Sequence, residues 1–169
     1  MVIQQVKSDI EKWLISFVEV PHPALGNFPP CPYARQARIK KQYDVRLGDD
    51  LERDLFVFAK KQYLGKNDVV IFAYPPKQYD DAYFNWAVDV INTSKGFRKR
   101  RLVALADHPD TVEEQNGVVF NMGKYALVLL QDKDKLDQHA RFLAHKGYYD
   151  GWNEEYLQDI FAHRKDPRT

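Results

Sequence analysis

The first part of the chain carries apolar residues at three- and four-residue steps, and this spacing predicts an amphipathic helix. These residues are Ile3, Val6, Ile10, Trp13, Leu14 and Phe17. A capping box from Ser8 to Glu11 would instead start the helix later. Four prolines between positions 21 and 30 predict an irregular loop. A short helix from Pro32 to about Lys40 is expected to follow, because proline is favoured at the first helical position.

Apolar runs bounded by polar residues predict four strands farther along the chain. They span Tyr43–Leu47, Val69–Ala73, Leu102–Ala106 and Tyr125–Gln131. Helical patterns separate or follow these runs. They extend from Asp49 to Gly65, from Asp80 or Asp81 to near Gly96, from about Asp134 to Lys146, and from Asn153 to His163. The polar segment between the third and fourth strands is short enough to permit an antiparallel pair.

The order of these elements predicts an α/β fold, although an α+β arrangement also fits. We expect one domain over residues 1–169, built on a layered mixed sheet of about four strands with at least one parallel crossover. Helices would flank the sheet in a ferredoxin-like or related topology, with an N-terminal helix and a C-terminal helical extension. The aromatic linker Tyr148–Trp152 predicts that the last helix docks onto the domain.

Charge and cysteine content narrow the classes of partner. The formal net charge of +1 argues against duplex DNA and other nucleic acids as partners. Charged residues interrupt the first 20 positions, so no signal peptide or membrane span is expected there. A single cysteine excludes an intrachain disulfide and fits a reducing cytoplasm. We therefore expect a cytoplasmic protein that binds no membrane. The oligomeric state is left open.

Cys31 is the residue that points most directly to chemistry. It precedes Pro32, so it would be the N-cap of the short helix, with its sulfur facing the free amides of the first turn. That position lowers the pKa of a thiol and favours a nucleophilic thiolate. Arg35 falls near the same helix face and Arg38 lies beyond it. The alternative is a small buried cysteine with a structural role only.

Two histidines next to prolines are further candidates. His22 lies in the loop before Cys31, and His108 follows the third predicted strand together with Asp107. Ligands of open α/β sheets bind outside the carboxyl ends of the strands, where Asp107 could orient the imidazole of His108. The alternative is a simple turn capped by aspartate. A metal site of Cys31, His22 and His108 is chemically possible, but the spacing is not diagnostic, so we expect no metal and no cofactor.

Several short motifs resemble a family of short, uncharacterised bacterial proteins. The motifs are Trp13-Leu14 with Phe17-Val18, Cys31-Pro32-Tyr33-Ala34, His108-Pro109, and the strand Tyr125–Leu130. This family has an Asn-rich, Arg-containing segment before that strand, where this chain retains Asn121 and Lys124. The resemblance implies a similar architecture and a ligand-binding role for Asn121. It implies no particular activity. Pro30–Tyr33 is also similar to the Cys-Pro-Tyr motif of glutaredoxins, but Ala34 replaces the second cysteine.

Two hypotheses of function follow. The first is an enzyme with Cys31 as nucleophile and with His108 and Asp107 in the same cleft. His22 would lie on a covering loop, while Arg35 and Arg38 would bind a small anionic substrate. The second is a non-catalytic domain of the same fold that binds a small ligand or a partner segment.

Overall fold

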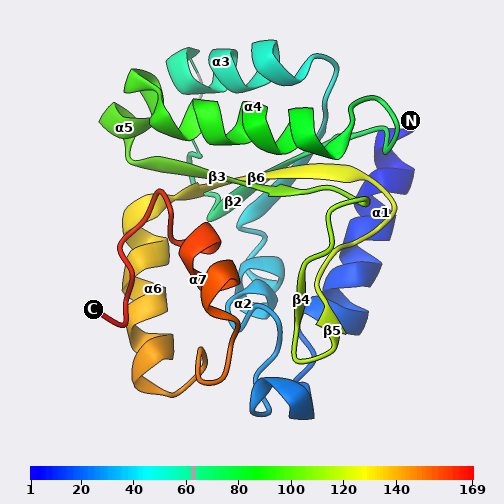
Figure 1. Ribbon diagram of the computed structural model, residues 1–169. Helices are drawn as coiled ribbons and strands as arrows, with labels where there is room; N and C mark the ends of the chain where they lie inside the picture. The colour runs from blue at the N-terminus through cyan, green and yellow to red at the C-terminus, as the bar shows by residue number, and fades with distance from the viewer. Residues whose placement is uncertain (62–63) are drawn as a thin grey trace.

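The computed structural model describes residues 1–61 and 64–169. A four-stranded mixed sheet crosses the molecule with helices on both faces (Figure 1). Its strands lie in the order β1 (Tyr43–Leu47), β2 (Val69–Tyr74), β6 (Ala126–Asp132) and β3 (Leu102–Asp107). The α/β class and the mixed sheet predicted from the sequence are confirmed.

The direction of the strands follows from their connections. β1 and β2 are parallel, because helix α3 (Leu51–Lys61) carries the chain back between them. β6 runs antiparallel to both β2 and β3, as the short segment between β3 and β6 allows. That segment also forms a small hairpin of β4 (Glu114–Gln115) and β5 (Val118–Val119). The main sheet thus follows the chain order β-α-β-α-β-β-α, which differs from the ferredoxin-like β-α-β-β-α-β.

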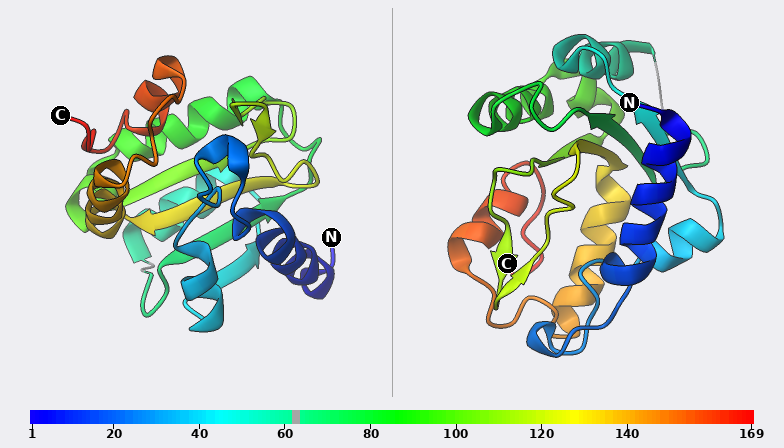
Figure 2. Two further views of the ribbon diagram at one scale, coloured as in Figure 1. Left: turned by 90° about the horizontal axis from the view of Figure 1, so that it is seen from below. Right: turned by 90° about the vertical axis from the view of Figure 1, so that its right-hand side faces the viewer.

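The helices divide between the two faces of the sheet. One face is covered by α3, α4 (Asp81–Thr93) and α5 (Lys95–Arg100), which lie above the sheet in Figure 1. Below it lie α1 (Ile3–Trp13), α2 (Ala34–Ile39), α6 (Lys133–His145) and α7 (Glu154–Ile160). Figure 2 shows that α1 and α6 lie toward opposite sides of this lower layer.

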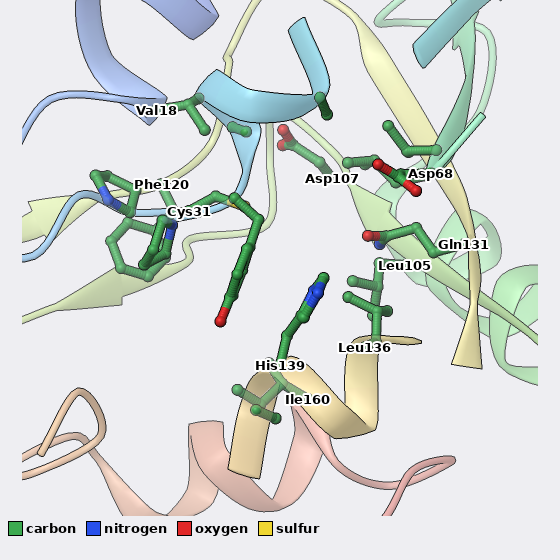
Figure 3. A pocket seen from close by; sticks show the side chains of 18 of the residues that line it. Val18, Cys31, Asp68, Leu105, Asp107, Phe120, Gln131, Leu136, His139 and Ile160 are labelled. Carbon is green, nitrogen blue, oxygen red and sulfur yellow. The ribbon is translucent and has the colours of Figure 1, made fainter. Parts of the chain in front are cut away.

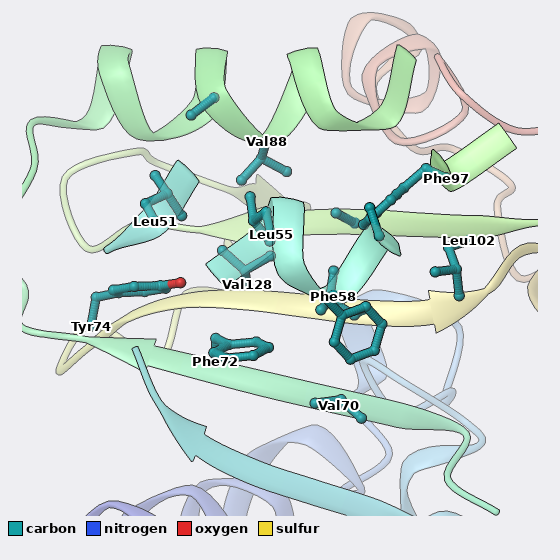
Figure 4. Packing of buried hydrophobic residues seen from close by; sticks show 14 of the residues in the cluster. Leu51, Leu55, Phe58, Val70, Phe72, Tyr74, Val88, Phe97, Leu102 and Val128 are labelled. Carbon is teal, nitrogen blue, oxygen red and sulfur yellow. The ribbon is translucent and has the colours of Figure 1, made fainter. Parts of the chain in front are cut away.

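The first face holds a continuous hydrophobic core (Figure 4). Leu51, Leu55 and Phe58 recur on one side of α3 and are almost fully buried against the strands. Edge strand β3 also gains polar support here, since the side-chain amide of Asn92 in α4 bonds both the N–H and the C=O of Ala104. These bonds satisfy backbone groups that the edge of a sheet would otherwise leave unpaired.

The second face is covered in two separate parts. Val6, Ile10 and Leu14 of the N-terminal helix pack on the sheet beside Ile71 and Leu127. The last turn of this helix widens into a π-helical segment, Leu14–Val18. A different cluster joins α6, α7 and the aromatic linker between them, as the sequence predicted. None of the described helices is long and apolar enough to cross a membrane.

Most predicted elements lie within two residues of their observed bounds, but some differ. The first helix begins at Ile3, not at the capping box. The helix expected to stop near Gly96 ends at Thr93, because Ser94 is extended and caps α5 instead. Helix α3 is described to Lys61, and residues 62 and 63, just before its predicted end at Gly65, lie outside the described residues.

Candidate functional site

A cavity of about 340 Å³ lies on the second face of the sheet, bounded by α1 and α2 and by α6 and α7 (Figure 3). Its floor is formed by side chains of β2, β6 and β3. They are Val69, Ile71, Leu105, Leu129 and Gln131. Leu105 and Leu129 are register partners in neighbouring strands, and both remain partly exposed. The middle of the sheet is therefore open to a ligand on this face.

Aromatic side chains form much of the cavity wall. The linker residue Trp152 is central, because its ring lies 5.4 Å from Tyr149, 5.6 Å from Phe120 and 6.0 Å from Tyr156 between centroids. Tyr149 is nine-tenths buried. Rings in these arrangements contribute both apolar area and fixed geometry. The wall therefore presents a nearly continuous aromatic surface to a flat, apolar ligand.

A stacked pair joins the two sides of the cavity. The ring of Tyr33, just before α2, stacks on His139 of α6 with centroids 3.7 Å apart and planes inclined by 13°. Burial lowers the pKa of His139, with a smaller upward contribution from Asp68. A neutral imidazole is therefore favoured at neutral pH, and it serves as a flat wall of the cavity.

Cys31 also lines the cavity; the residue as a whole is exposed to solvent, but its sulfur is surrounded by protein atoms. Helix α2 begins at Ala34 with Tyr33 as its N-cap, so the predicted N-cap position of Cys31 is wrong. Desolvation by the surrounding protein raises the pKa of the Cys31 thiol, and the backbone amides of Tyr33 and Ala34 offset only part of this effect. This direction is opposite to the predicted one and favours a protonated thiol at neutral pH.

Two carboxyl groups, Asp107 and Glu113, face the cavity near Tyr156. Asp107 accepts hydrogen bonds from Met122 N and Asn121 Nδ2, each at 3.1 Å, and burial raises its pKa. Glu113 has no side-chain hydrogen bond among the described residues. Burial, together with the charges of Asp107 and Asp159, raises the pKa of Glu113 to about 8. Such a perturbed acid in a pocket marks a candidate functional group.

The cations that line the cavity are held by carboxylates of the protein itself. Arg38 Nε lies 2.6 Å from Glu19 Oε1, Lys135 Nζ lies 3.2 Å from Asp68 Oδ1, and Arg164 Nε lies 3.2 Å from Asp137 Oδ1. Because each of these cations is already paired with a carboxylate of the chain, none is available to bind an anionic ligand.

The structure separates several residues that the sequence analysis placed together. The ring of His108 is fully buried on the other face, 5.4 Å from Phe84, and Nε2 lies 3.0 Å from Tyr79 O. His22 caps its own turn by accepting from Ala24 N, and it does not line the cavity. Arg35 is exposed and also lies outside the lining. The expected convergence of both histidines with Cys31 is therefore not observed.

Other predicted residues do lie at or beside the cavity. Cys31, Asp107 and Arg38 line it, while Asn121 lies behind Asp107 and also accepts from Glu113 N at 2.9 Å. In the part of the chain that the structure describes, no group of three His, Cys, Asp or Glu side chains is arranged to hold a metal ion.

Several cavity residues were missed by sequence reasoning. Glu113 lies in the polar segment between the third and fourth predicted strands, to which no site residue but Asn121 was assigned, and Trp152 and Tyr156 lie in the C-terminal extension. The dense aromatic linker was the available signal, since it predicted docking of α7 and could have predicted an aromatic wall. Comparison with protein-family models, curated proteins and solved structures finds no match.

Proposed function

We propose that this chain is a binding domain for a small molecule with a largely apolar or aromatic body, which occupies the cavity beside Cys31. The observation that carries the proposal is the cavity itself, with a volume of about 340 Å³ over the middle of the sheet. Pockets of this size, with apolar walls and a few converging polar groups, are typical ligand sites.

The same geometry gives less support to a thiol enzyme acting on an anion. Such an enzyme needs an ionised Cys31, but burial raises the pKa of this thiol. It also needs a base beside the sulfur, and the predicted base His108 is buried on the opposite face with Phe84. The predicted anion-binding residue Arg35 lies outside the cavity, and Arg38 is bound to Glu19. A binding role requires none of these groups.

The test is a titration with N-phenyl-1-naphthylamine, a neutral aromatic dye that fluoresces in apolar surroundings. We expect saturable binding with a Kd of roughly micromolar order. Leu136 of α6 lines the cavity, so Leu136→Trp would fill part of the cavity with an indole ring. This variant should bind the dye at least about tenfold more weakly, which corresponds to about 1.4 kcal/mol.

The matched control is Val90→Trp, which adds the same ring on the exposed surface of α4. It should leave the Kd unchanged. Equal affinities for the wild type and both variants would show that the dye binds elsewhere. No saturable binding to the wild type would contradict the proposal.

A further inference from the structure

The charges around the cavity are unevenly compensated. Each lining arginine or lysine is paired with a carboxylate of the chain, as described above. Asp107 and Glu113 have no cationic side chain within salt-bridge distance among the described residues. Asp107 is bonded to amide groups only, and Glu113 has no side-chain partner. The cavity therefore has an acidic end without an ion pair among the described residues, and the charge of His108, from the other face of the sheet, acts only on Asp107.

Further acidic groups lie near these two carboxyl groups and add to the negative potential at this end of the cavity. Asp159 and the Tyr156 hydroxyl of α7 are close enough to couple electrostatically with Glu113. None of these groups supplies positive charge. A carboxylate in such a desolvated position is costly unless a cation or hydrogen-bond donor approaches it. A ligand is able to provide that donor.

Aromatic rings surround the same end of the cavity. Phe120, Trp152 and Tyr156 form a triangle of rings with centroids 5.6 to 6.2 Å apart. Ring faces attract organic cations, most strongly where water is excluded. Carboxylates beside such rings form a receptor for a substituted ammonium group.

A second polar group also lacks a partner in this cavity. Tyr149 is nine-tenths buried and lines the cavity, yet its hydroxyl makes no hydrogen bond among the described residues. A hydroxyl at a cavity wall without a protein partner bonds to water or to a polar group of a ligand. The Tyr149 hydroxyl lies near Arg164 and Cys31, apart from the acidic end, and offers a second polar contact to a ligand.

We propose that the ligand is a small organic cation, an ammonium group carried on an aromatic or apolar body, with the ammonium between Glu113, Asp107 and the Phe120–Trp152–Tyr156 rings. This inference rests on the proposed binding function and names the chemical class of its ligand. The apolar body would lie over the floor formed by Leu105 and Leu129, with the Tyr149 hydroxyl available to a polar substituent.

The test compares three indoles of similar size that differ in charge. Tryptamine is a cation below about pH 10, 3-ethylindole is neutral, and indole-3-propionate is an anion. Each displaces bound N-phenyl-1-naphthylamine in the same assay at about pH 8.5. We expect tryptamine to bind about tenfold more tightly than 3-ethylindole, and indole-3-propionate to bind most weakly.

Glu113→Gln should remove the advantage of tryptamine and leave the affinity for 3-ethylindole unchanged. The control is Glu114→Gln, which neutralises the neighbouring exposed glutamate outside this cavity and should change neither affinity. In the wild type, tryptamine affinity should rise from about pH 6.5 to about pH 9, because a cation binds the ionised Glu113 better. This rise should be absent in Glu113→Gln.

The two proposals fail in different ways. If 3-ethylindole binds as tightly as tryptamine, or if Glu113→Gln leaves the tryptamine affinity unchanged, the cation inference is wrong and the binding function stands. If the dye binds but tryptamine does not displace it, the cation inference is likewise wrong and the binding function stands. If neither the dye nor any indole binds, the binding function itself is contradicted.

Discussion

The two faces of one sheet are used differently, and residues adjacent in sequence show the contrast. On β6, Val128 and Leu130 are fully buried in the core that the sheet shares with α3 and α4, and Figure 4 shows Val128 there. Leu129, between them, points to the opposite face and remains partly exposed in the floor of the cavity. The same strand thus contributes to a close-packed core on one side and to a binding surface on the other.

The difference comes from how the helices cover each face. α3, α4 and α5 form one continuous layer, whereas α1 packs on the β1 and β2 side and α6 and α7 form their own cluster (Figure 2). A continuous layer buries every inward side chain and supplies stability. A divided layer leaves room over the central strands. We infer that the first face supplies most of the stability and the second supplies the site.

Alanine substitutions at Leu130, on the core face, and at Leu129, on the cavity face, should distinguish the stabilising face from the binding face. Of the changes considered, Leu130→Ala should reduce stability most. Leu130→Ala creates a cavity in a packed core and should lower the free energy of unfolding by about 3–5 kcal/mol. Leu129→Ala enlarges a space that is already open and should cost about 1–2 kcal/mol. Urea denaturation measures both values. Equal losses would show that the cavity face is packed as tightly as the core.

A smaller effect on stability is expected from Glu113. The folded-state pKa of about 8 lies above the ordinary value of 4.5. The folded protein therefore favours the protonated Glu113 carboxyl group. The stability that this protonated group contributes is fully present below about pH 4.5, and it is lost as the pH rises through about 8. Glu113→Gln should be more stable than the wild type at about pH 9, by roughly 2 kcal/mol, and the difference should vanish at about pH 4.5. The pH dependence of chemical denaturation tests this. A constant difference across the range would show that Glu113 is not buried near like charges.

The main sheet was predictable because its strands are apolar runs with polar boundaries. The range Tyr43–Leu47 matches β1 at both ends, and β3 extends one residue beyond the predicted Ala106. The hairpin β4–β5 was missed because two-residue strands carry no measurable periodicity. The π-helical segment Leu14–Val18 was missed for a related reason, since its apolar residues fit an ordinary helical pattern.

The site was predicted only in part, and the geometry of strands explains why. Asp107 and His108 are adjacent, so their side chains leave the strand end toward opposite faces, and one residue lines the cavity while the other is buried beneath α4. Glu113 and Tyr156 are distant in sequence and meet only because α7 docks beside the segment that follows β3. No local pattern encodes such a meeting. Cys31 was found because its proline context is local.

The most direct test of a ligand beside Cys31 is the rate at which iodoacetamide alkylates this single cysteine. Saturating N-phenyl-1-naphthylamine should slow alkylation of the folded wild type by about tenfold or more, because the bound dye covers the thiol. Leu136→Trp, whose affinity for the dye is expected to be at least about tenfold lower, should show clearly less protection at the same dye concentration. If the dye saturates the wild type and Cys31 is alkylated at an unchanged rate, the ligand does not occupy this cavity and the account is contradicted.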